Sequence, residues 1–378
     1  MILYLTLGDN YSGIYKSQVI DVVSFLKSNF DIKIRLIAFI SIRVYKSNRK
    51  KIKQYLPDAI ILPMFPKLTN WKWNSLLLIL MCLLFRPVKI IARGPIATFL
   101  ALFCKKYKLT KTIVLDCRGV VAAEWNEYNV IKNIVMEQKI KMIESYSIIN
   151  SDFRIAVSNK LVEYWRQEYG FISDEYVVIP CTLNQSFLNV DISTNQIIEA
   201  RFKMGFTTEQ IVLIYSGSTA GWQSFNILSD YIRSVFEKQN NCVLFFLGQE
   251  NKDIEKLNEQ FPDRVKNKYV NPEEVMNYLI GADYGLLIRE NSITNQVASP
   301  VKFAEYLVCG LNVIISEGLG DYSKFVTEMN CGFIYNKQKI LNSISLEEKN
   351  INKTLALKFF SKENNIDNYK KVIDFNNI

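Results

Sequence analysis

The stretch from Gly285 to Ser316 restricts the fold more than any other part of the chain. Its two ends, 285–288 and 312–316, are short apolar runs, a pattern typical of buried strands. Between them lie a polar loop and a segment, 301–309, that has the composition of a helix. The order strand, loop, helix, strand is the repeating unit of a parallel sheet, so we expect an α/β fold.

Three residues mark the ends of this helix. Ser299 is a good N-cap, and Pro300 is of a type favoured at the first helical position. Gly310 is a typical residue just beyond a helix C-terminus. The signals together predict a helix over 301–309 that follows the polar loop 289–298.

Lys302 and Glu305 carry the chemistry of this helix. They are three residues apart and therefore project from the same face. Lys302 lies near the N-terminus of the predicted helix, where backbone N–H groups are unpaired and the helix dipole has its positive end. This position favours an anion such as a diphosphate beside it. Glu305 is an acceptor-only carboxylate suited to the two hydroxyls of a ribose. The alternative is a surface ion pair on an ordinary amphipathic helix.

Residues 299–316, SPVKFAEYLVCGLNVIIS, are very similar to the donor-site segment of family 4 glycosyltransferases of the GT-B fold. The resemblance implies two Rossmann-like α/β domains that face each other across a cleft. It also implies that Lys302 contacts the diphosphate of a sugar nucleotide and that Glu305 contacts its ribose.

One position departs from the family pattern. Many members carry a second glutamate eight positions before the one that corresponds to Glu305, and this chain has Val297 there. That glutamate grips the transferred sugar in the family. Glu290, Asn291 and Asn295, in the same loop, are the candidates to replace it.

A loop of small residues, 216–221, resembles the segment that flanks the donor phosphates. It follows the apolar run 211–215, and its small side chains permit close approach of the backbone to a ligand. It lacks the GxGxxG pattern of dinucleotide-binding proteins. Family members often have a basic residue after this loop, but this chain has Trp222 and Gln223, so Lys302 is expected to neutralise the phosphates with Arg289. The full set of expected donor-binding residues is Gly217, Ser218, Val270, Asn291, Ser299, Pro300 and Val301, with Lys302, Glu305 and Arg289 as catalytic residues.

The N-terminal half contains segments that resemble the acceptor side of polysaccharide-building members of the family. Arg93-Gly94-Pro95 and Asp116-Cys117-Arg118-Gly119 each follow an apolar run, so their side chains are expected at the binding edge of the sheet. For Asp116 and Arg118 the alternative is an internal salt bridge. The expected acceptor-side residues are Gly13, Arg93, Asp116, Arg118 and Glu124.

The chain length of 378 residues suits two domains. We expect an acceptor-side domain over 1–188, joined by a C-terminal helix at about 360–378, and a nucleotide-sugar domain over 189–359. The absence of histidine excludes Ser-His-Asp and Cys-His catalysis, and also histidine metal sites. The seven cysteines contain no Cys-x-x-Cys pair and, with no secretory signal recognised, predict reduced cytosolic thiols.

Charge is distributed unevenly. Residues 1–150 hold 23 Lys and Arg against 9 Asp and Glu, a balance of +14, while the remainder holds 23 against 28, a balance of −5. Basic clusters alternate with Trp71, Trp73 and the apolar run 76–85, which suits a peripheral site on an anionic membrane. That run is too short to span a bilayer. A solvated basic surface is the alternative, and a nucleic-acid partner is ranked lower because no binding motif accompanies the charge.

The resemblance implies a bacterial retaining hexosyltransferase of polysaccharide biosynthesis, for O-antigen or capsule. The resemblance implies transfer from a nucleoside diphosphate sugar to an oligosaccharide or lipid-linked glycan, without a cofactor and without a metal. The expected location is cytoplasmic, at the inner face of the plasma membrane. Two alternatives are a UDP-sugar 2-epimerase of the same fold and a non-catalytic sugar-nucleotide-binding protein, the latter because of Val297.

Overall fold

The computed structural model describes residues 1–66, 68–128, 130, 134–217, 225–250 and 252–376. It divides into two units, the first formed by 1–184 with 365–378 and the second by 185–364. The predicted boundaries lay at 188 and at about 360.

A parallel sheet of seven strands forms the centre of the first unit in the described part of the chain. The strand order is β3-β2-β1-β4-β5-β6-β7, so the direction of winding reverses between β1 and β4. The strands are β1 (Ile2–Leu7), β2 (Ile34–Ser41), β3 (Ile60–Met64), β4 (Lys89–Arg93), β5 (Thr112–Cys117), β6 (Phe153–Ala156) and β7 (Tyr176–Val178).

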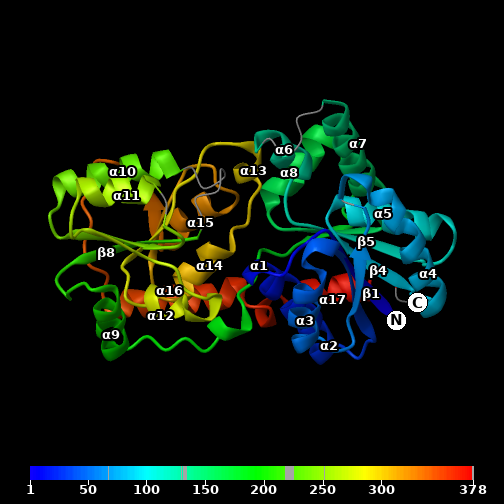
Figure 1. The fold of residues 1–378 in the computed structure, drawn as a ribbon, viewed down its shortest axis with the longest axis horizontal. Helices are drawn as coiled ribbons and strands as arrows, with labels where there is room; N and C mark the ends of the chain where they lie inside the picture. Colours follow the sequence, from blue (N-terminus) through cyan, green and yellow to red (C-terminus); the bar gives the residue numbers. More distant parts are fainter. Residues whose placement is uncertain (67, 129, 131–133, 218–224, 251, 377–378) are drawn as a thin grey trace. The chain divides into compact units, whose positions relative to one another are not determined.

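Helices cover both faces of this sheet (Figure 1). Side chains alternate along a strand, so Ile2 and Tyr4 of β1 join one core while Leu3 and Leu5 join the other. The first core contains α2, α3 and α17, and the second contains α4, α5 and α7. The helices of the unit are α1 (Gly13–Tyr15), α2 (Asp21–Asn29), α3 (Tyr45–Tyr55), α4 (Ser75–Phe85), α5 (Pro95–Lys106), α6 (Val121–Glu127), α7 (Ile134–Asn150), α8 (Asn159–Tyr169) and α17 (Ile366–Asp374).

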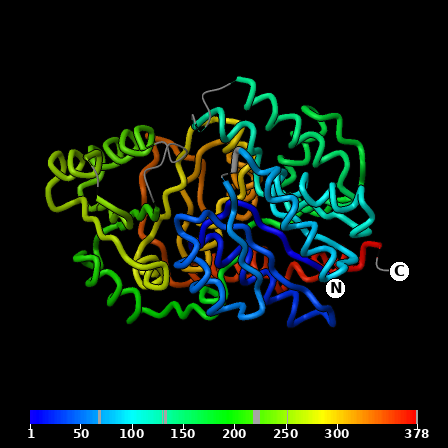
Figure 2. Tube along the Cα trace, turned by 45° about the vertical axis from the view of Figure 1, so that its right-hand side comes forward, coloured from blue at the N-terminus to red at the C-terminus, as the bar shows by residue number. Residues whose placement is uncertain are grey.

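The C-terminal helix α17 completes the first unit, as the trace beside the N-terminal strand shows (Figure 2). Tyr369, Val372 and Ile373 are buried in the core that contains β1. The ammonium of Lys89 on β4 donates to the carbonyls of Val372 at 2.9 Å and Ile373 at 2.6 Å. These bonds hold the last turns of α17, where carbonyls lack intrahelical partners.

The second unit contains a parallel sheet of six strands within the described residues, in the order β10-β9-β8-β11-β12-β13. Here the winding reverses between β8 and β11. The strands are β8 (Ile211–Ser216), β9 (Cys242–Leu247), β10 (Val265–Lys268), β11 (Tyr284–Leu287), β12 (Asn312–Ile315) and β13 (Gly332–Ile334). The helices are α9 (Thr194–Met204), α10 (Phe225–Lys238), α11 (Lys252–Gln260), α12 (Met276–Leu279), α13 (Ile293–Gln296), α14 (Val301–Val308), α15 (Tyr322–Met329) and α16 (Leu346–Phe360).

Two expected elements differ in the second unit. The apolar pair at 269–270 predicts a short strand, and this prediction is wrong, because β10 ends at Lys268. The sequence also predicts one helix over 354–378, but α16 begins at Leu346 after a capping box at Ser345 and ends at Phe360, and α17 begins at Ile366. In the described residues no helix combines the length and apolar character that crossing a bilayer requires.

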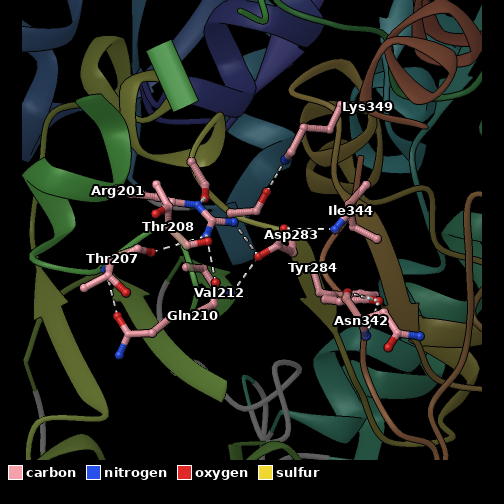
Figure 3. Close-up of polar contacts among 12 residues, drawn as sticks. Arg201, Thr207, Thr208, Gln210, Val212, Asp283, Tyr284, Asn342, Ile344 and Lys349 are labelled. Carbon is pink, nitrogen blue, oxygen red and sulfur yellow. Dashed lines mark hydrogen bonds and ion pairs between the residues drawn. The ribbon is translucent and has the colours of Figure 1, made fainter. Parts of the chain in front are cut away.

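A buried polar network joins α9, β11 and α16 (Figure 3). Arg201 Nη2 lies 2.7 Å from Asp283 Oδ2, which also accepts from the backbone N–H of Val212 at 2.8 Å. The other carboxylate oxygen accepts from the N–H of Ile344 at 3.2 Å. Lys349 donates to the carbonyl of Ala282. The network therefore fixes the start of β11, the strand whose far end leads into the candidate site.

Candidate functional site

The candidate donor site lies where the winding of the second sheet reverses. Ligands of open α/β sheets bind beyond the carboxyl ends of the strands at such a point. Gly217 directly follows β8, and Arg289 lies two residues beyond β11. Helix α14 packs against β11 and β12. Gly217, Arg289 and Lys302 therefore come from three elements that meet beside one reversal.

The N-terminus of α14 differs from the expected arrangement. Pro300 is the N-cap, with φ −69° and ψ 122°, and the helix begins at Val301. Ser299 is buried, and its hydroxyl forms a 2.6 Å hydrogen bond with the hydroxyl of Tyr322 on α15. The predicted roles of Ser299 as cap and Pro300 as first helical residue were therefore wrong. Gly310, with φ +83°, takes the expected place after the C-terminus.

Lys302 has a buried ammonium group that, among the described residues, lacks a hydrogen-bond partner. Its Nζ lies 5.1 Å from the centre of the Tyr215 ring, at the end of β8. Burial, together with the nearby Arg289 guanidinium, lowers the pKa of Lys302 to about 7, while Glu305 opposes the shift. An anion placed here would restore the charged form and offset the cost of burying it.

Gly217 allows this close approach. Its φ is +137°, and a Cβ atom built on it would lie 1.9 Å from Lys302 Nζ. A side chain at position 217 would therefore displace the lysine in addition to straining the backbone. The sequence predicts that small residues in the loop after β8 permit a close approach, and the contact at Gly217 is consistent with this. The neighbouring Ser218 lies outside the described residues.

Glu305 lies one turn deeper on α14 and is half-buried. Burial raises the pKa of its carboxyl to about 7, and Lys302 opposes the shift. The next residue, Tyr306, was not singled out from the sequence. Its hydroxyl accepts a 2.9 Å hydrogen bond from the N–H of Ser216 and so attaches the end of β8 to α14. Gly285 was the available signal, because a Cβ there would lie 2.3 Å from the Tyr306 ring.

The loop after β11 contains a short helix, α13, where the sequence indicated only a polar loop. The guanidinium of Arg289 donates from Nη1 to Asn295 Oδ1 at 3.3 Å, and the backbone N–H of Arg289 donates to Ser316 Oγ at 2.7 Å. Val297 is buried in this loop. Among the three candidates to replace the missing glutamate, Asn295 is buried and bound to Arg289, whereas Glu290 and Asn291 are exposed.

Two other expected donor residues have less distinctive surroundings. Asn291 accepts from Gln296 Nε2 at 2.8 Å, at the exposed edge of the loop. Val270 is half-buried and lies two residues after the end of β10.

Three of the five expected acceptor-side residues line a cavity in the first unit. It has a volume of about 240 Å³ and lies past the ends of β1 and β4, where the first sheet reverses. Arg93, Arg118 and Glu124 line it, together with Asp9 and Trp125. Gly13 is the exposed first residue of α1 and is not part of this lining.

Asp116 lies inside β5 and is fully buried, which corrects the prediction that it follows the strand. Its carboxylate accepts from the Tyr4 hydroxyl and lies 2.7 Å from Arg118 Nε. The internal salt bridge foreseen as the alternative is therefore present. Asp116 is placed to orient Arg118, which lines the cavity.

A buried glutamate that the sequence did not reveal positions α6. Glu144 on α7 accepts from the N–H groups of Val121 at 2.9 Å and Ala122 at 3.1 Å, and from the Tyr169 hydroxyl at 3.2 Å. Burial raises the pKa of Glu144 to about 7. Since α6 carries Glu124, this contact fixes one wall of the cavity.

Solved structures share this architecture over almost the whole chain. HepE from Anabaena in complex with UDP matches with a TM-score of 0.72 and 12% identity, covering 99% of this chain and 100% of that chain. Sucrose-phosphate synthase from Thermosynechococcus elongatus matches with a TM-score of 0.70 and 12% identity, covering 98% of each. The chain has the GT-B fold.

The same fold also occurs in a different class of enzyme. UDP-GlcNAc 2-epimerase from Neisseria meningitidis, bound to UDP-GlcNAc, matches with a TM-score of 0.54 and 13% identity, covering 98% of this chain and 94% of that chain. No protein-family model and no curated protein sequence matches the chain. At these identities the similarity establishes the fold and leaves the activity to the chemistry of the site.

Proposed function

We propose that the chain is a retaining glycosyltransferase that moves a hexose-type sugar from a nucleoside diphosphate to a hydroxyl of a glycan. The observation that carries the proposal is the buried ammonium of Lys302, which lies beside Gly217 at the winding reversal and has no hydrogen-bond partner in the described chain. The HepE structure, which contains UDP, supports a nucleotide ligand for this fold.

In the proposed reaction the bond between the sugar C1 and the diphosphate oxygen breaks, and the acceptor oxygen bonds to C1 on the same face. The acceptor proton passes to the departing diphosphate. Lys302 and the N-terminus of α14 stabilise the charge that develops on the leaving group. Arg289, whose guanidinium lies near enough to lower the pKa of Lys302, is the second phosphate ligand. Glu305 binds the ribose, and neither a metal nor a cofactor takes part.

The acceptor is proposed to be a lipid-linked glycan, bound at the cavity lined by Arg93, Arg118 and Glu124. The first unit presents leucines of α4 to solvent between its basic segments, with exposed fractions of 68% for Leu76 and 67% for Leu84. Exposed apolar and cationic groups favour a peripheral position on an anionic membrane. We therefore place the enzyme at the inner face of a bacterial plasma membrane, in surface polysaccharide synthesis of the O-antigen or capsule type.

Thermal denaturation with UDP, GDP, ADP or dTDP tests the donor assignment. A ligand that binds only the folded state raises the melting temperature, so one diphosphate should raise it and the others should not. The Lys302→Ala variant provides the control, because the same nucleotide should raise its melting temperature less. If none of the four changes the melting temperature of the unaltered protein, the proposed function fails.

Epimerisation is the second candidate, because the Neisseria meningitidis enzyme shares the fold. Incubation with UDP-GlcNAc alone separates the two reactions. An epimerase converts the free sugar nucleotide, whereas a transferase requires an acceptor. Nucleotide binding without either reaction, across a panel of acceptors, would indicate a non-catalytic binding protein.

A further inference from the structure

A groove on the first unit is separate from the acceptor-side cavity and from the candidate donor site. Its volume is about 500 Å³, within the range of ligand pockets. Three segments form it: the turn before α4, the outer stripe of α5 and the middle of α7. Most of its lining is apolar or aromatic, including Phe99, Leu102 and Met142.

Three positively charged side chains border the groove. Lys72, Lys106 and Lys139 line it, one from each segment, and among the described residues of its lining none is acidic. The ammonium groups of Lys72 and Lys139 lie 5.8 Å and 6.0 Å from the ring of Trp71, which is itself almost completely buried. An apolar channel with three lysines at its border is complementary to a molecule with a hydrocarbon chain and an anionic end.

The aromatic wall of the groove has a defined geometry. The Phe99 ring makes edge-to-face contacts with Trp71 at 5.0 Å, Phe103 at 5.2 Å and Tyr146 at 5.3 Å between centroids. These contacts hold the rings in place. Met142, in contrast, is 66% exposed although it lines an apolar surface. Such surface is costly in water and marks a binding site when it is contiguous.

One helix connects this groove to the candidate acceptor cavity. Pro95 and Ala97, in the first turn of α5, line the cavity, while Phe99, Phe103 and Lys106, further along, line the groove. A helix rises about 1.5 Å per residue, so both sites lie within about 18 Å along α5. A molecule with a polar end and a lipid end can therefore occupy both.

We propose that this groove binds the hydrocarbon chain of the lipid that carries the acceptor glycan, with the lipid phosphate against Lys72, Lys106 and Lys139. This inference rests on the proposed glycosyltransferase function, because it assigns the lipid part of that acceptor. It differs from general adsorption to a membrane, since a single lipid in free solution binds to the groove.

Dodecyl phosphate, used below its critical micelle concentration, is the probe for this site. Titration calorimetry should show saturable binding at one site, and dodecyl maltoside, which has the same chain and no charge, should bind at least tenfold more weakly. Each lysine near an anionic group contributes about fivefold in affinity. The triple variant K72Q/K106Q/K139Q should therefore lose at least tenfold.

The matched control removes the same charge elsewhere on the unit. Lys46, Arg49 and Lys50 are exposed on α3, and none of them lines the groove. The variant K46Q/R49Q/K50Q should retain the affinity for dodecyl phosphate. A second groove variant, Met142→Glu, changes an exposed residue and should weaken binding without unfolding the protein.

The outcomes separate this inference from the proposed function. Equal binding of both detergents, or equal affinity in the two triple variants, would overturn it. If phosphatidylglycerol vesicles compete for the groove as effectively as dodecyl phosphate binds to it, the groove binds bilayer lipid. That result would overturn the acceptor-lipid assignment. In every groove variant the nucleotide should still raise the melting temperature. Loss of that rise would count against the proposed donor site and not against the groove.

Discussion

Two clusters of buried charge in the second unit differ in how their polar atoms are satisfied. Arg201 and Asp283 form a 2.7 Å ion pair, and Lys349 donates to a backbone carbonyl (Figure 3). Lys302 has a buried ammonium with no hydrogen-bond partner in the described structure. Burial lowers the pKa of both lysines, to about 8 for Lys349 and about 7 for Lys302.

The difference teaches which cluster serves the fold and which serves a ligand. Burying an ion is costly unless hydrogen bonds and an opposite charge compensate. In the first cluster the protein supplies those partners, so losing one should destabilise the fold. In the second cluster the partner is missing, so we infer that a diphosphate supplies it.

The largest expected effect comes from breaking the satisfied cluster. Asp283→Ala leaves Arg201 buried without its carboxylate and removes acceptors for Val212 and Ile344. We expect a loss of about 3–5 kcal/mol in the free energy of unfolding, measured by urea denaturation. Nucleotide affinity of the remaining folded protein should not change. Unaltered stability would contradict the structural role of this cluster.

Lys302→Ala should give the opposite result. Loss of a charge-assisted contact worth about 1.5–3 kcal/mol lowers turnover by at least tenfold. The free energy of unfolding should stay the same or rise, since an unpartnered buried ammonium is removed. Lys349→Met is the matched control: it should reduce stability and leave nucleotide binding intact. If the two lysine variants behaved alike, the comparison between the clusters would be wrong.

The pH dependence of nucleotide affinity sharpens the same comparison. The pKa of Lys302 is about 7 without ligand, and a bound diphosphate raises it by favouring the charged form. The contribution of Lys302 to nucleotide affinity is therefore constant below pH 7. Above pH 7 it falls by up to about tenfold per pH unit. Calorimetric titrations with the selected nucleotide should show this fall in Glu305→Gln, where the second group with a pKa of about 7 is absent. A fall that persists in Lys302→Ala would assign it to another group.

The smallest effect is expected at Ser299, which supports the loop without capping α14. Ser299→Ala removes one buried hydrogen bond to Tyr322 and should cost about 1 kcal/mol of unfolding free energy. Tyr322→Phe is the partner variant, and the double variant should cost little more than either alone, because both remove the same bond. Additive losses in this cycle would show that the two hydroxyls act separately.

Local sequence signals predicted α14 well and β10 poorly. Helix α14 has an apolar face, a preceding proline and Gly310 after its C-terminus, so its location could be read along the chain. Strand β10 has the sequence VKNK, with a single apolar residue, and the predicted strand at 269–270 begins only after β10 ends. The short β13 at Gly332–Ile334 was not identified, since three half-exposed residues give little periodicity.

The candidate site was predicted in part. Lys302 and Glu305 followed from helical spacing and the family resemblance, whereas Tyr306 and Glu144 did not. Tyr306 acts on Ser216 and Glu144 acts on Val121, and neither contact leaves a pattern in the neighbouring sequence. The serine cap also failed, because a local preference for Ser299 was overridden by its buried contact with Tyr322.

By itself, the sequence determined the alternation of strands and helices, because apolar periodicity and helix-end residues act over a few neighbouring positions. Tertiary structure alone decided that Lys302 meets Gly217 and that the Tyr4 hydroxyl donates to Asp116. These partners are distant along the chain, and only the parallel stacking of strands brings their ends to one edge. The environment of a charge depends on all its neighbours in space, so burial and pKa appear only once the fold is complete.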